Sequence, residues 1–298
     1  MSAGTPARAE PVAVALAGAG PWATNAYAPM LAAGPETRLA GVWARRGEAA
    51  RELAAAHGVP AFTSFEALLA SCEAVAFAVP PDVQAELGVL AARAGRHLML
   101  DKPLALELPD AERLAEAALG AGCVTQLMLT HRFRSTTSSW LEQARASGAI
   151  GARLAFLSGA FVRGPYACPW RREHGALHDL GPHAFDLLEG ALGPIVHITG
   201  RGDPRRWVSL ACEHEGGAVS DLSLSGVMTL PQTVFTLECY GPQGALAFDA
   251  VAASAESPWG EVRRLFARAV RGGPRSPHDV RRGLELQRLI AMAIVAVG

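Results

Sequence analysis

Charged residues, long apolar runs and ordered cysteine pairs are all scarce in this chain of 298 residues. Only 18% of the residues are charged and the formal net charge is −1. No basic run is long enough to follow a nucleic-acid backbone, and no apolar run approaches the roughly 20 residues of a membrane helix. The sequence therefore argues against nucleic-acid binding and membrane insertion. With half of its residues hydrophobic, it predicts large buried cores.

The cysteines are few, odd in number and never arranged as C-x-x-C. They are Cys72, Cys123, Cys168, Cys212 and Cys239. This distribution is typical of buried thiols in a reducing compartment and gives no support to a disulfide or zinc framework. Residues 1–10 mix small and charged residues without an apolar stretch, so they resemble a frayed terminus rather than a signal peptide. We expect a cytoplasmic protein.

Lysine is almost absent. Of the 27 basic residues only Lys102 is a lysine, and it follows an apolar run at the expected end of a strand. Lysine differs from arginine in that it can act as a point donor or as a base when it is partly buried. We therefore interpret Lys102 as a functional residue. The alternative is a surface residue that a codon bias happened to spare.

The first 130 residues alternate apolar runs with alanine-rich amphipathic segments, which is the βαβ pattern of a parallel sheet. Strands are expected at Val12–Ala17, Leu39–Trp43, Ala74–Val79, His97–Leu100 and Cys123–Leu129. Helices are expected near 22–33, 47–57, 65–70, 82–94 and 109–121. Because these strands are apolar almost throughout, we expect both faces of the sheet to be covered.

From about residue 131 the pattern predicts a mostly antiparallel sheet with a few helices. A helix is expected near 136–147, a strand at Arg153–Val162, a turn-rich stretch ending near 175, and a short helix after Gly181-Pro182. Further strands are expected near 195–200, 206–214, 217–228 and 233–248. A long connection at 251–280 then precedes a closing helix at Leu284–Val297. The chain is thus expected to be an α/β protein with two domains, 1–130 and 131–298.

A G-x-G-x-x-A motif, Gly18-Ala19-Gly20-Pro21-Trp22-Ala23, follows the first expected strand and opens the first expected helix. Gly18 allows the tight turn, Gly20 lets a pyrophosphate approach the backbone, and Ala23 lets the helix pack closely. The helix N-terminus offers N–H groups to the anion. This predicts a dinucleotide site that includes Pro21 and Trp22. A glycine-rich turn that binds nothing has the same pattern.

The second expected strand ends in Trp43-Ala44-Arg45-Arg46, where an NAD site usually carries an acidic residue. The guanidinium groups of Arg45 and Arg46 instead suit a 2′-phosphate, so they favour NADP(H). NAD(H) is the alternative if both side chains are merely solvated. Pro80 ends the third expected strand, where a loop can run beneath the nicotinamide half of a dinucleotide.

Asp179 and His183 are spaced one helical turn apart, and Asp186 follows after another turn. A carboxylate beside an imidazole fixes its tautomer and raises its pKa, which would make His183 a proton shuttle near neutral pH. The alternative is a helix capped by Asp179 with His183 buried in the core. A metal site that adds His174 and His178 is a weaker interpretation, since no acidic or cysteine cluster joins them, and we expect no metal.

In this order the motifs resemble those of the Gfo/Idh/MocA oxidoreductase family over nearly the whole chain. The family's E-K-P segment corresponds to Asp101-Lys102-Pro103, with aspartate in place of glutamate. Its D-x-G-x-H-x-x-D motif is intact from Asp179 to Asp186, and its Y/H-R-F segment resembles His131-Arg132-Phe133. The resemblance implies a doubly wound parallel Rossmann domain followed by an α/β domain with a large, mostly antiparallel open sheet. That sheet would cover the nicotinamide with one face and build homodimers or homotetramers with the other.

The resemblance also implies which residues form the site. Lys102 and His183 would be the polar pair at the reacting carbon, with Asp179 close to the substrate hydroxyls. Asp101 and Lys102 would contact the cofactor. Trp170 and Arg171 precede the motif and could line the substrate pocket, although Trp170 is equally compatible with a core position.

We therefore expect an NADP(H)-dependent oxidoreductase that moves a hydride between the nicotinamide and a carbinol or carbonyl carbon of a sugar, cyclitol or related small molecule. His183 would exchange the proton of the substrate oxygen, Lys102 would stabilise the alkoxide, and Asp179 would orient His183 or a hydroxyl. The alternatives are a nucleotide-binding sensor without turnover and a reductase of an imine or another natural-product intermediate.

Overall fold

The computed structural model describes residues 10–298, so the expectation of a frayed N-terminus falls almost wholly on residues outside it. Its first sheet has five parallel strands in the order β2-β1-β3-β4-β5. They are β1 (Val12–Ala17), β2 (Thr37–Trp43), β3 (Ala74–Phe77), β4 (His97–Leu100) and β5 (Thr125–Leu127). Nearly every strand residue is buried, which confirms a parallel sheet covered on both faces.

Helices connect these strands close to the expected positions. They are η1 (Ala23–Tyr27) with α1 (Ala28–Ala32), α2 (Gly47–Ala56), α3 (Phe65–Ala70), α4 (Pro81–Arg93) and α5 (Leu108–Gly120). Ser64 caps α3 by accepting a hydrogen bond from the N–H of Ala67. The first connection differs from a regular helix because η1 is π-helical, a form that is often found next to functional sites.

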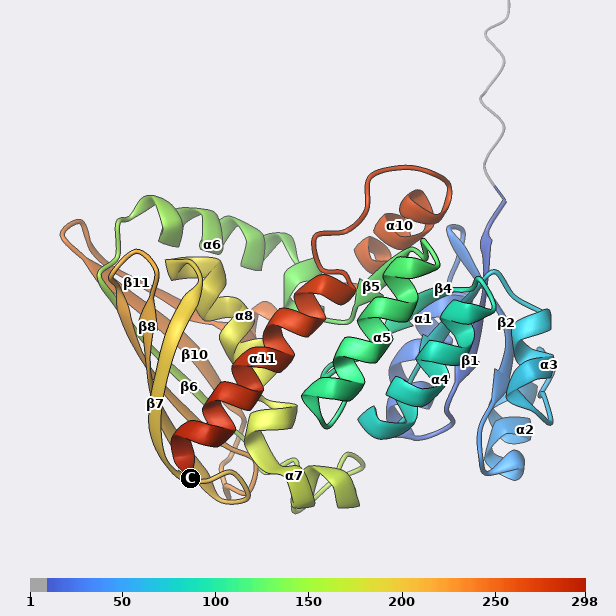
Figure 1. Cartoon of the computed structure of the whole chain (residues 1–298), viewed down its shortest axis with the longest axis horizontal. Coiled ribbons are helices and arrows are strands. Elements are labelled where there is room, and N and C mark those ends of the chain that lie inside the picture. Colours follow the sequence, from blue (N-terminus) through green and yellow to red (C-terminus); the bar gives the residue numbers. More distant parts are fainter. Residues whose placement is uncertain (1–9) are drawn as a thin grey trace, which may run out of the picture.

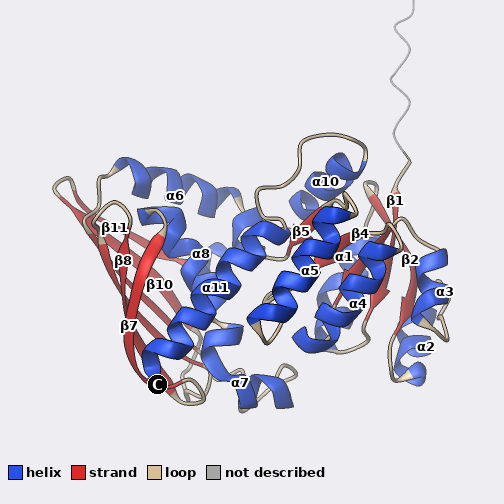
Figure 2. Ribbon diagram, in the orientation of Figure 1, coloured by secondary structure: helices blue, strands red, loops and turns tan. Residues whose placement is uncertain are grey.

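The second sheet has six strands in the order β11-β10-β6-β9-β8-β7, and only the β6–β9 pair is parallel. The strands are β6 (Gly151–Leu157), β7 (Ile195–Asp203), β8 (Trp207–His214), β9 (Val219–Ser225), β10 (Val234–Gly241) and β11 (Gly244–Asp249). Helix α8 (Gly181–Leu192) packs against this sheet, and α6 (Ser135–Ala146) packs against α8. The predicted α/β class with one parallel and one mostly antiparallel sheet is confirmed (Figure 2).

Five sequence-based expectations in the second half are wrong. The stretch expected to be turns contains α7 (Pro169–Asp179), whose helix is interrupted at Gly175. The expected strand near 233–248 is the β10–β11 hairpin, since Pro242 and Gln243 form its turn. The expected strand Arg153–Val162 ends at Leu157. The expected connection at 251–280 contains α9 (Ala250–Ala253) and α10 (Trp259–Val270), and α11 (Val280–Val297) begins four residues early because Asp279 caps it.

After the second sheet the chain passes back beside the first sheet as α10, and α11 then ends next to β7 of the second sheet (Figure 1). Helix α11 contacts β7 of the second sheet and α5 beside the first sheet, and α10 contacts α1. Figure 1 shows α11 crossing between the two sheets. A division of the chain at residue 130 stays a prediction. Within residues 10–298, no helix is long and apolar enough to cross a membrane.

Candidate functional site

The G-x-G-x-x-A turn lies where the chain leaves β1 for the first helix, beside the end of β3. Gly18 has φ +124°, and a Cβ at this position would lie 2.3 Å from the carbonyl oxygen of Ala78. Only glycine permits this approach of two strand ends. A Cβ built on Gly20, by contrast, has no atom within 4 Å, because that residue faces open space.

This open space is a cleft of about 690 Å³ at the tips of the parallel strands, which we call the strand-tip cleft. Gly20, Pro21, Trp22, Pro80, Asp101 and Lys102 line it, together with residues of the loop before α7 and of α7 itself. Parallel α/β sheets bind nucleotides at the strand tips where the strand order reverses, which in this sheet is between β1 and β3. Ala23 is fully buried at the start of η1, as close helix packing requires.

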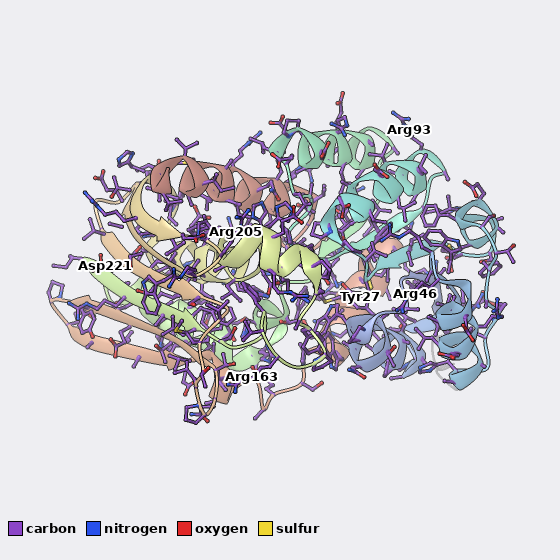
Figure 3. The ribbon with its side chains drawn as sticks, turned by 90° about the horizontal axis from the view of Figure 1, so that it is seen from below. Tyr27, Arg46, Arg93, Arg163, Arg205 and Asp221 are labelled. Carbon is purple, nitrogen blue, oxygen red and sulfur yellow. The ribbon has the colours of Figure 1, made fainter. Side chains whose placement is uncertain are left out.

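Arg45 and Arg46 lie apart from the cleft lining. Both side chains are exposed between β2 and α2, and no ion pair or hydrogen bond engages either guanidinium within the described part of the chain. Figure 3 shows Arg46 on the side of the molecule formed by the first sheet. The two groups are therefore available to a ligand that extends beyond the cleft.

The turn that carries Lys102 is held by Gln84, a residue that the sequence reasoning missed. Gln84 is buried in α4, and its side-chain amide donates to the carbonyl oxygens of Asp101, Pro103 and Leu104 at 2.9–3.1 Å. Its Oε1 accepts from the N–H of Asp101 at 2.7 Å. Its signal in the sequence is a polar residue among the buried positions of α4, which are otherwise apolar.

Lys102, Asp179 and Arg171 form a buried ionic cluster. Lys102 Nζ donates to both the carbonyl oxygen and Oδ1 of Asp179 at 2.7 Å, and Arg171 Nε lies 3.0 Å from Asp179 Oδ2. Burial by itself would raise the pKa of Asp179, but the charges of Lys102 and Arg171 outweigh it and lower that pKa below its usual value. Asp179 is therefore a carboxylate at neutral pH.

His183 has different neighbours from those that its spacing suggested. Among the described residues no side chain hydrogen-bonds to His183, and Asp179 is instead engaged by Lys102 and Arg171. The ring of His183 contacts His131 edge-on at 5.4 Å between centroids. Burial, followed by the charge of Lys102, holds the pKa of His183 well below 6.5. The expectation that Asp179 raises this pKa is wrong, and the imidazole is neutral at neutral pH.

The Oδ1 of Asp101 accepts a hydrogen bond from the backbone N–H of Lys102 at 2.8 Å. Its carboxyl is buried, which raises its pKa to about 6, although the charge of Lys102 opposes the shift. Asp101 therefore takes up a proton at mildly acidic pH, unlike Asp179.

These groups surround a second space, which we call the inner cavity. Its volume is about 820 Å³, a part of which is open to solvent, and it lies next to the strand-tip cleft, with which it shares Trp22, Asp101, Lys102, Tyr166 and Arg171. Asp179 and His183 complete its polar wall, whereas Phe156 and Met128 are on its apolar wall. The structure thus brings Lys102, Asp179 and His183 together at one cavity.

Aromatic side chains border both spaces. Trp22 contacts Tyr27, Tyr166 and Trp259 edge-on with ring centroids 6.0–6.2 Å apart. The guanidinium of Arg171 lies 4.9 Å from the ring centroid of Trp170. Trp170 lines the strand-tip cleft and is absent from the lining of the inner cavity, whereas Arg171 lines both.

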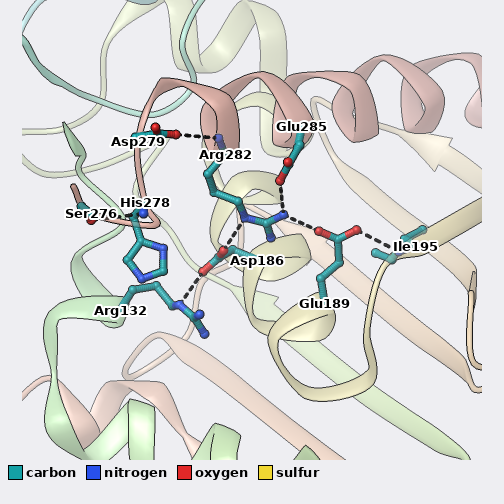
Figure 4. A network of polar contacts seen from close by, with 9 residues as sticks. All are labelled: Arg132, Asp186, Glu189, Ile195, Ser276, His278, Asp279, Arg282 and Glu285. Atoms are coloured by element: carbon teal, nitrogen blue, oxygen red, sulfur yellow. Dashed lines mark hydrogen bonds and ion pairs between the residues drawn. The ribbon is translucent and has the colours of Figure 1, made fainter. Parts of the chain in front are cut away.

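Asp186, the last residue of the D-x-G-x-H-x-x-D motif, has a structural position (Figure 4). It is 2% exposed and pairs with Arg132 at 3.4 Å and with Arg282 of α11 at 2.9 Å. Arg282 also binds Glu189 at 2.6 Å. The network joins α8 and α11 to η2 (Thr130–Phe133), which carries His131.

His174 and His178 serve local packing. The ring nitrogens of His178 lie 3.2 and 3.1 Å from the carbonyl oxygens of His174 and Leu106, so the nitrogen that carries the hydrogen donates to the backbone. Across residues 10–298 no group of three or more His, Cys, Asp or Glu side chains is arranged to hold a metal ion.

Comparison with known proteins gives a consistent result. Residues 12–129 match the model of an oxidoreductase family with an NAD-binding Rossmann fold, and residues 139–247 match the GFO/IDH/MocA C-terminal domain. The dTDP-3,4-didehydro-2,6-dideoxy-alpha-D-glucose 3-reductase of Streptomyces violaceoruber is 29% identical over 269 residues, which cover 84% of this chain and 76% of that enzyme. The enzyme of the same name from Streptomyces antibioticus is 30% identical over 251 residues, or 78% and 74% of the two chains.

Solved structures share the fold. The crystal structure of GenD2 from gentamicin A biosynthesis, in complex with NAD, matches with a TM-score of 0.85 over 97% of this chain and 94% of that one. The sequence identity is 21%.

Proposed function

Because the chain belongs to the Gfo/Idh/MocA oxidoreductase family, we propose that it uses NADP(H) to interconvert a hydroxyl and a keto group on a sugar. The observation that carries this proposal is the adjacency of the strand-tip cleft to an inner cavity with Lys102, Asp179 and His183 on one wall.

The residues of the cleft fit a dinucleotide. Gly18 allows the ends of β1 and β3 to approach each other, and Gly20 leaves its backbone accessible to a ligand. Pro80 and Asp101 line the cleft. A nicotinamide bound beside Lys102 would supply or accept the hydride. The protein's part is then to place the substrate oxygen and to handle its proton and charge.

Lys102 stabilises the negative charge that develops on the substrate oxygen. Two of the three N–H groups of its ammonium are donated to Asp179, which leaves one for the inner cavity. Preorganised donors of this kind lower the barrier because they need no rearrangement during the reaction. Asp179 fixes the ammonium and carries a compensating charge, so it acts on Lys102 rather than on His183.

His183 exchanges the proton of the substrate oxygen. Its ring is neutral at neutral pH, since burial and the nearby charge of Lys102 lower its pKa. A neutral imidazole can accept the proton of a hydroxyl group as that group is oxidised. The edge contact with His131 keeps the ring in one orientation.

The substrate class is proposed from the relatives and from the cavity. The two Streptomyces reductases described above are named for a keto-sugar linked to dTDP. The inner cavity combines an apolar wall with a few polar groups, as small-molecule sites do. This composition suits a sugar ring with one reacting oxygen at the polar end.

The experiment that tests this function measures absorbance of the reduced nicotinamide with NADPH or NADH and a panel of keto-sugars, free and nucleotide-linked. We expect turnover by the wild type and a loss of about 100-fold or more in kcat for His183→Asn, because general acid–base catalysis contributes about that much. NADPH affinity should stay the same, which fluorescence titration would check. If none of the keto-sugars is turned over, or if the variant keeps full activity, the assignment is contradicted.

The preference for NADP(H) has its own test. Arg45 and Arg46 are free of partners within the described residues and lie beyond β2. Arg45→Ala should weaken NADPH binding by roughly tenfold, since a charge-assisted hydrogen bond contributes about 1.5–3 kcal/mol, and should leave NADH binding nearly unchanged. Equal losses for the two cofactors would defeat the phosphate assignment.

Two further features belong to the proposal. The five cysteines are unpaired, which supports action in the reducing cytoplasm. The outer face of the second sheet exposes Val196, Trp207, Val219 and Tyr240, which supports assembly of copies through this sheet.

A further inference from the structure

The inner cavity also adjoins another space, through residues that do not line the strand-tip cleft. It shares Ala160 and Thr233 with a third space of about 910 Å³, which we call the mouth groove. Gly159, Ala160 and Arg163, from the segment after β6, form one side of the groove, and residues 230–233, before β10, form the other. The inner cavity therefore adjoins both the strand-tip cleft and the mouth groove, because it shares lining residues with each.

The mouth groove carries one charged group. Arg163 is the single ionisable side chain among its lining residues, and no carboxylate of the described chain lines it. Its Nη2 donates to the carbonyl oxygen of Leu230 at 2.9 Å. A Cβ built on Gly159 would lie 2.9 Å from Arg163 Nε, so the guanidinium rests directly on the backbone of that glycine. Arg163 is thus exposed yet held in place by both sides of the groove.

We propose that the mouth groove is a subsite for an anionic part of the substrate, and that this part is the diphosphate of a nucleotide-linked sugar. The inference rests on the proposed function, because it takes Lys102 and His183 as the place where the sugar reacts. A substrate that reaches from there to Arg163 must extend beyond its sugar ring. A fixed guanidinium is a good partner for phosphate oxygens, which it can bind with two parallel N–H groups.

The position of the groove agrees with this substrate class. Arg163 and Arg46 lie on well-separated parts of the molecule in Figure 3, so Arg163 is not placed to serve the adenosine end of the dinucleotide. The groove is open to solvent, which lets a charged group keep part of its hydration. The dTDP-linked substrates in the names of the relatives have the same layout, a sugar ring followed by a diphosphate.

The first arm of the test compares a dTDP-linked keto-sugar with the methyl glycoside of the same keto-sugar in steady-state kinetics. We expect the wild type to prefer the linked sugar, and Arg163→Gln to raise its KM about tenfold or more, since one charge-assisted contact contributes about that factor. Arg163→Lys keeps the positive charge but lacks the two parallel N–H groups of the guanidinium, so its KM for the linked sugar should lie between those of the wild type and Arg163→Gln. The matched control is Arg93→Gln, an exposed arginine at the end of α4 that should behave as the wild type.

The second arm is independent of turnover. Calorimetry would measure the binding of thymidine diphosphate with NADPH at saturation, so that the strand-tip cleft is already filled. We expect the dissociation constant to rise about tenfold in Arg163→Gln and to remain at the wild-type value in Arg93→Gln.

The outcomes separate this inference from the proposed function. Equal kcat/KM for the linked sugar and the glycoside, or unchanged diphosphate affinity in Arg163→Gln, would overturn the subsite while hydride transfer still stood. Better turnover of a sugar acid or sugar monophosphate than of the linked sugar would overturn the diphosphate assignment. Diphosphate binding that depends on Arg163 without any hydride transfer would support the subsite and contradict the proposed oxidoreductase reaction.

Discussion

A single carboxylate, Asp179, holds the two cations nearest the proposed reaction centre. Lys102 and Asp179 are 13% and 8% exposed, and removing either partner would leave the other charge buried. Asp179 binds the ammonium through both its backbone and its side chain, so the position of Nζ is fixed in two directions. The choice of lysine at this site, in a chain that otherwise uses arginine, follows from the need for a compact donor.

Lys102→Arg tests this reasoning. The planar guanidinium is longer and cannot place one N–H where Nζ lies while it also satisfies both oxygens of Asp179. We expect kcat to fall by about two orders of magnitude, the usual cost of losing one preorganised donor. The far-ultraviolet circular dichroism and the affinity for NADPH should stay the same. A variant with wild-type kcat would remove Lys102 from the reaction.

At the residue scale the sequence predicted which side chains lie together better than it predicted their contacts. Lys102, Asp179 and His183 meet at one cavity, as expected. Their pairing differed because helical spacing describes one helix, whereas Gly175 interrupts α7, Asp179 is the last residue of α7 and His183 lies in α8. Gln84, His131 and Arg163 act through contacts with distant segments, which a single sequence does not display.

At the scale of elements, the arrangement of α8, α11 and η2 depends on Arg282. Its guanidinium pairs with Asp186 and Glu189 of α8, and Arg132 of η2 shares Asp186. Burial favours the neutral form of Arg282, yet the charges of Asp186 and Glu189 outweigh it and raise its pKa above the usual value. The last helix of the chain therefore fixes the positions of η2, which carries His131, and of α8, which carries His183.

Arg282→Ala should lower the free energy of unfolding by about 3–5 kcal/mol, because it leaves the buried carboxylate of Asp186 with one partner fewer. Arg281→Ala is the matched control. Arg281 is the preceding residue on α11, is 59% exposed, and pairs only within its own turn, with Asp279. Its removal should cost less than about 1 kcal/mol. Urea unfolding of the two variants would decide, and equal losses would contradict the role of the network.

The elements that the sequence missed share a cause. Helix α10 lies between segments rich in proline, glycine and serine, and its buried side is narrow, with Val262 and Phe266 one turn apart. Helix α7 begins at Pro169 after a turn-rich loop, so its polar first turns look like a continuation of that loop. Long, strongly apolar strands such as β1 were predicted to the residue because their signal is local.

At the scale of the whole molecule, the second half of the chain stabilises the first. Besides the passage of α11 between the sheets, Arg271 after α10 pairs with Glu73 before β3, and Gln126 of β5 donates to the carbonyl oxygen of Val262 in α10. One cluster of buried apolar side chains includes Leu100 of β4 and Leu289 of α11. We therefore expect a perturbation in either half to change the stability of both.

Buried histidines make this stability dependent on pH. Burial lowers the pKa of His131 and of His278 to about 4 and that of His183 well below 6.5. Between pH 6.5 and 4 the unfolded chain therefore binds protons at these sites that the folded chain does not, and the free energy of unfolding falls as pH decreases. Asp101 has the opposite effect on stability. Its pKa is raised to about 6, so as pH decreases the folded chain binds this proton before the unfolded chain does, which offsets the effect of one histidine.

Urea unfolding at pH 7, 6 and 5 would measure the effect. Each unopposed histidine contributes up to about 1.4 kcal/mol per pH unit. Burial also lowers the pKa of His97 and of His178, so the histidines together outweigh the one carboxylate and should give a clear loss of stability between pH 6 and 5. His278→Asn removes one titrating group that packs against Phe133 at the centre of the molecule. It should reduce the slope by up to about 1.4 kcal/mol per pH unit. An identical slope in the variant would mean that His278 is already charged in the folded protein, contrary to its burial.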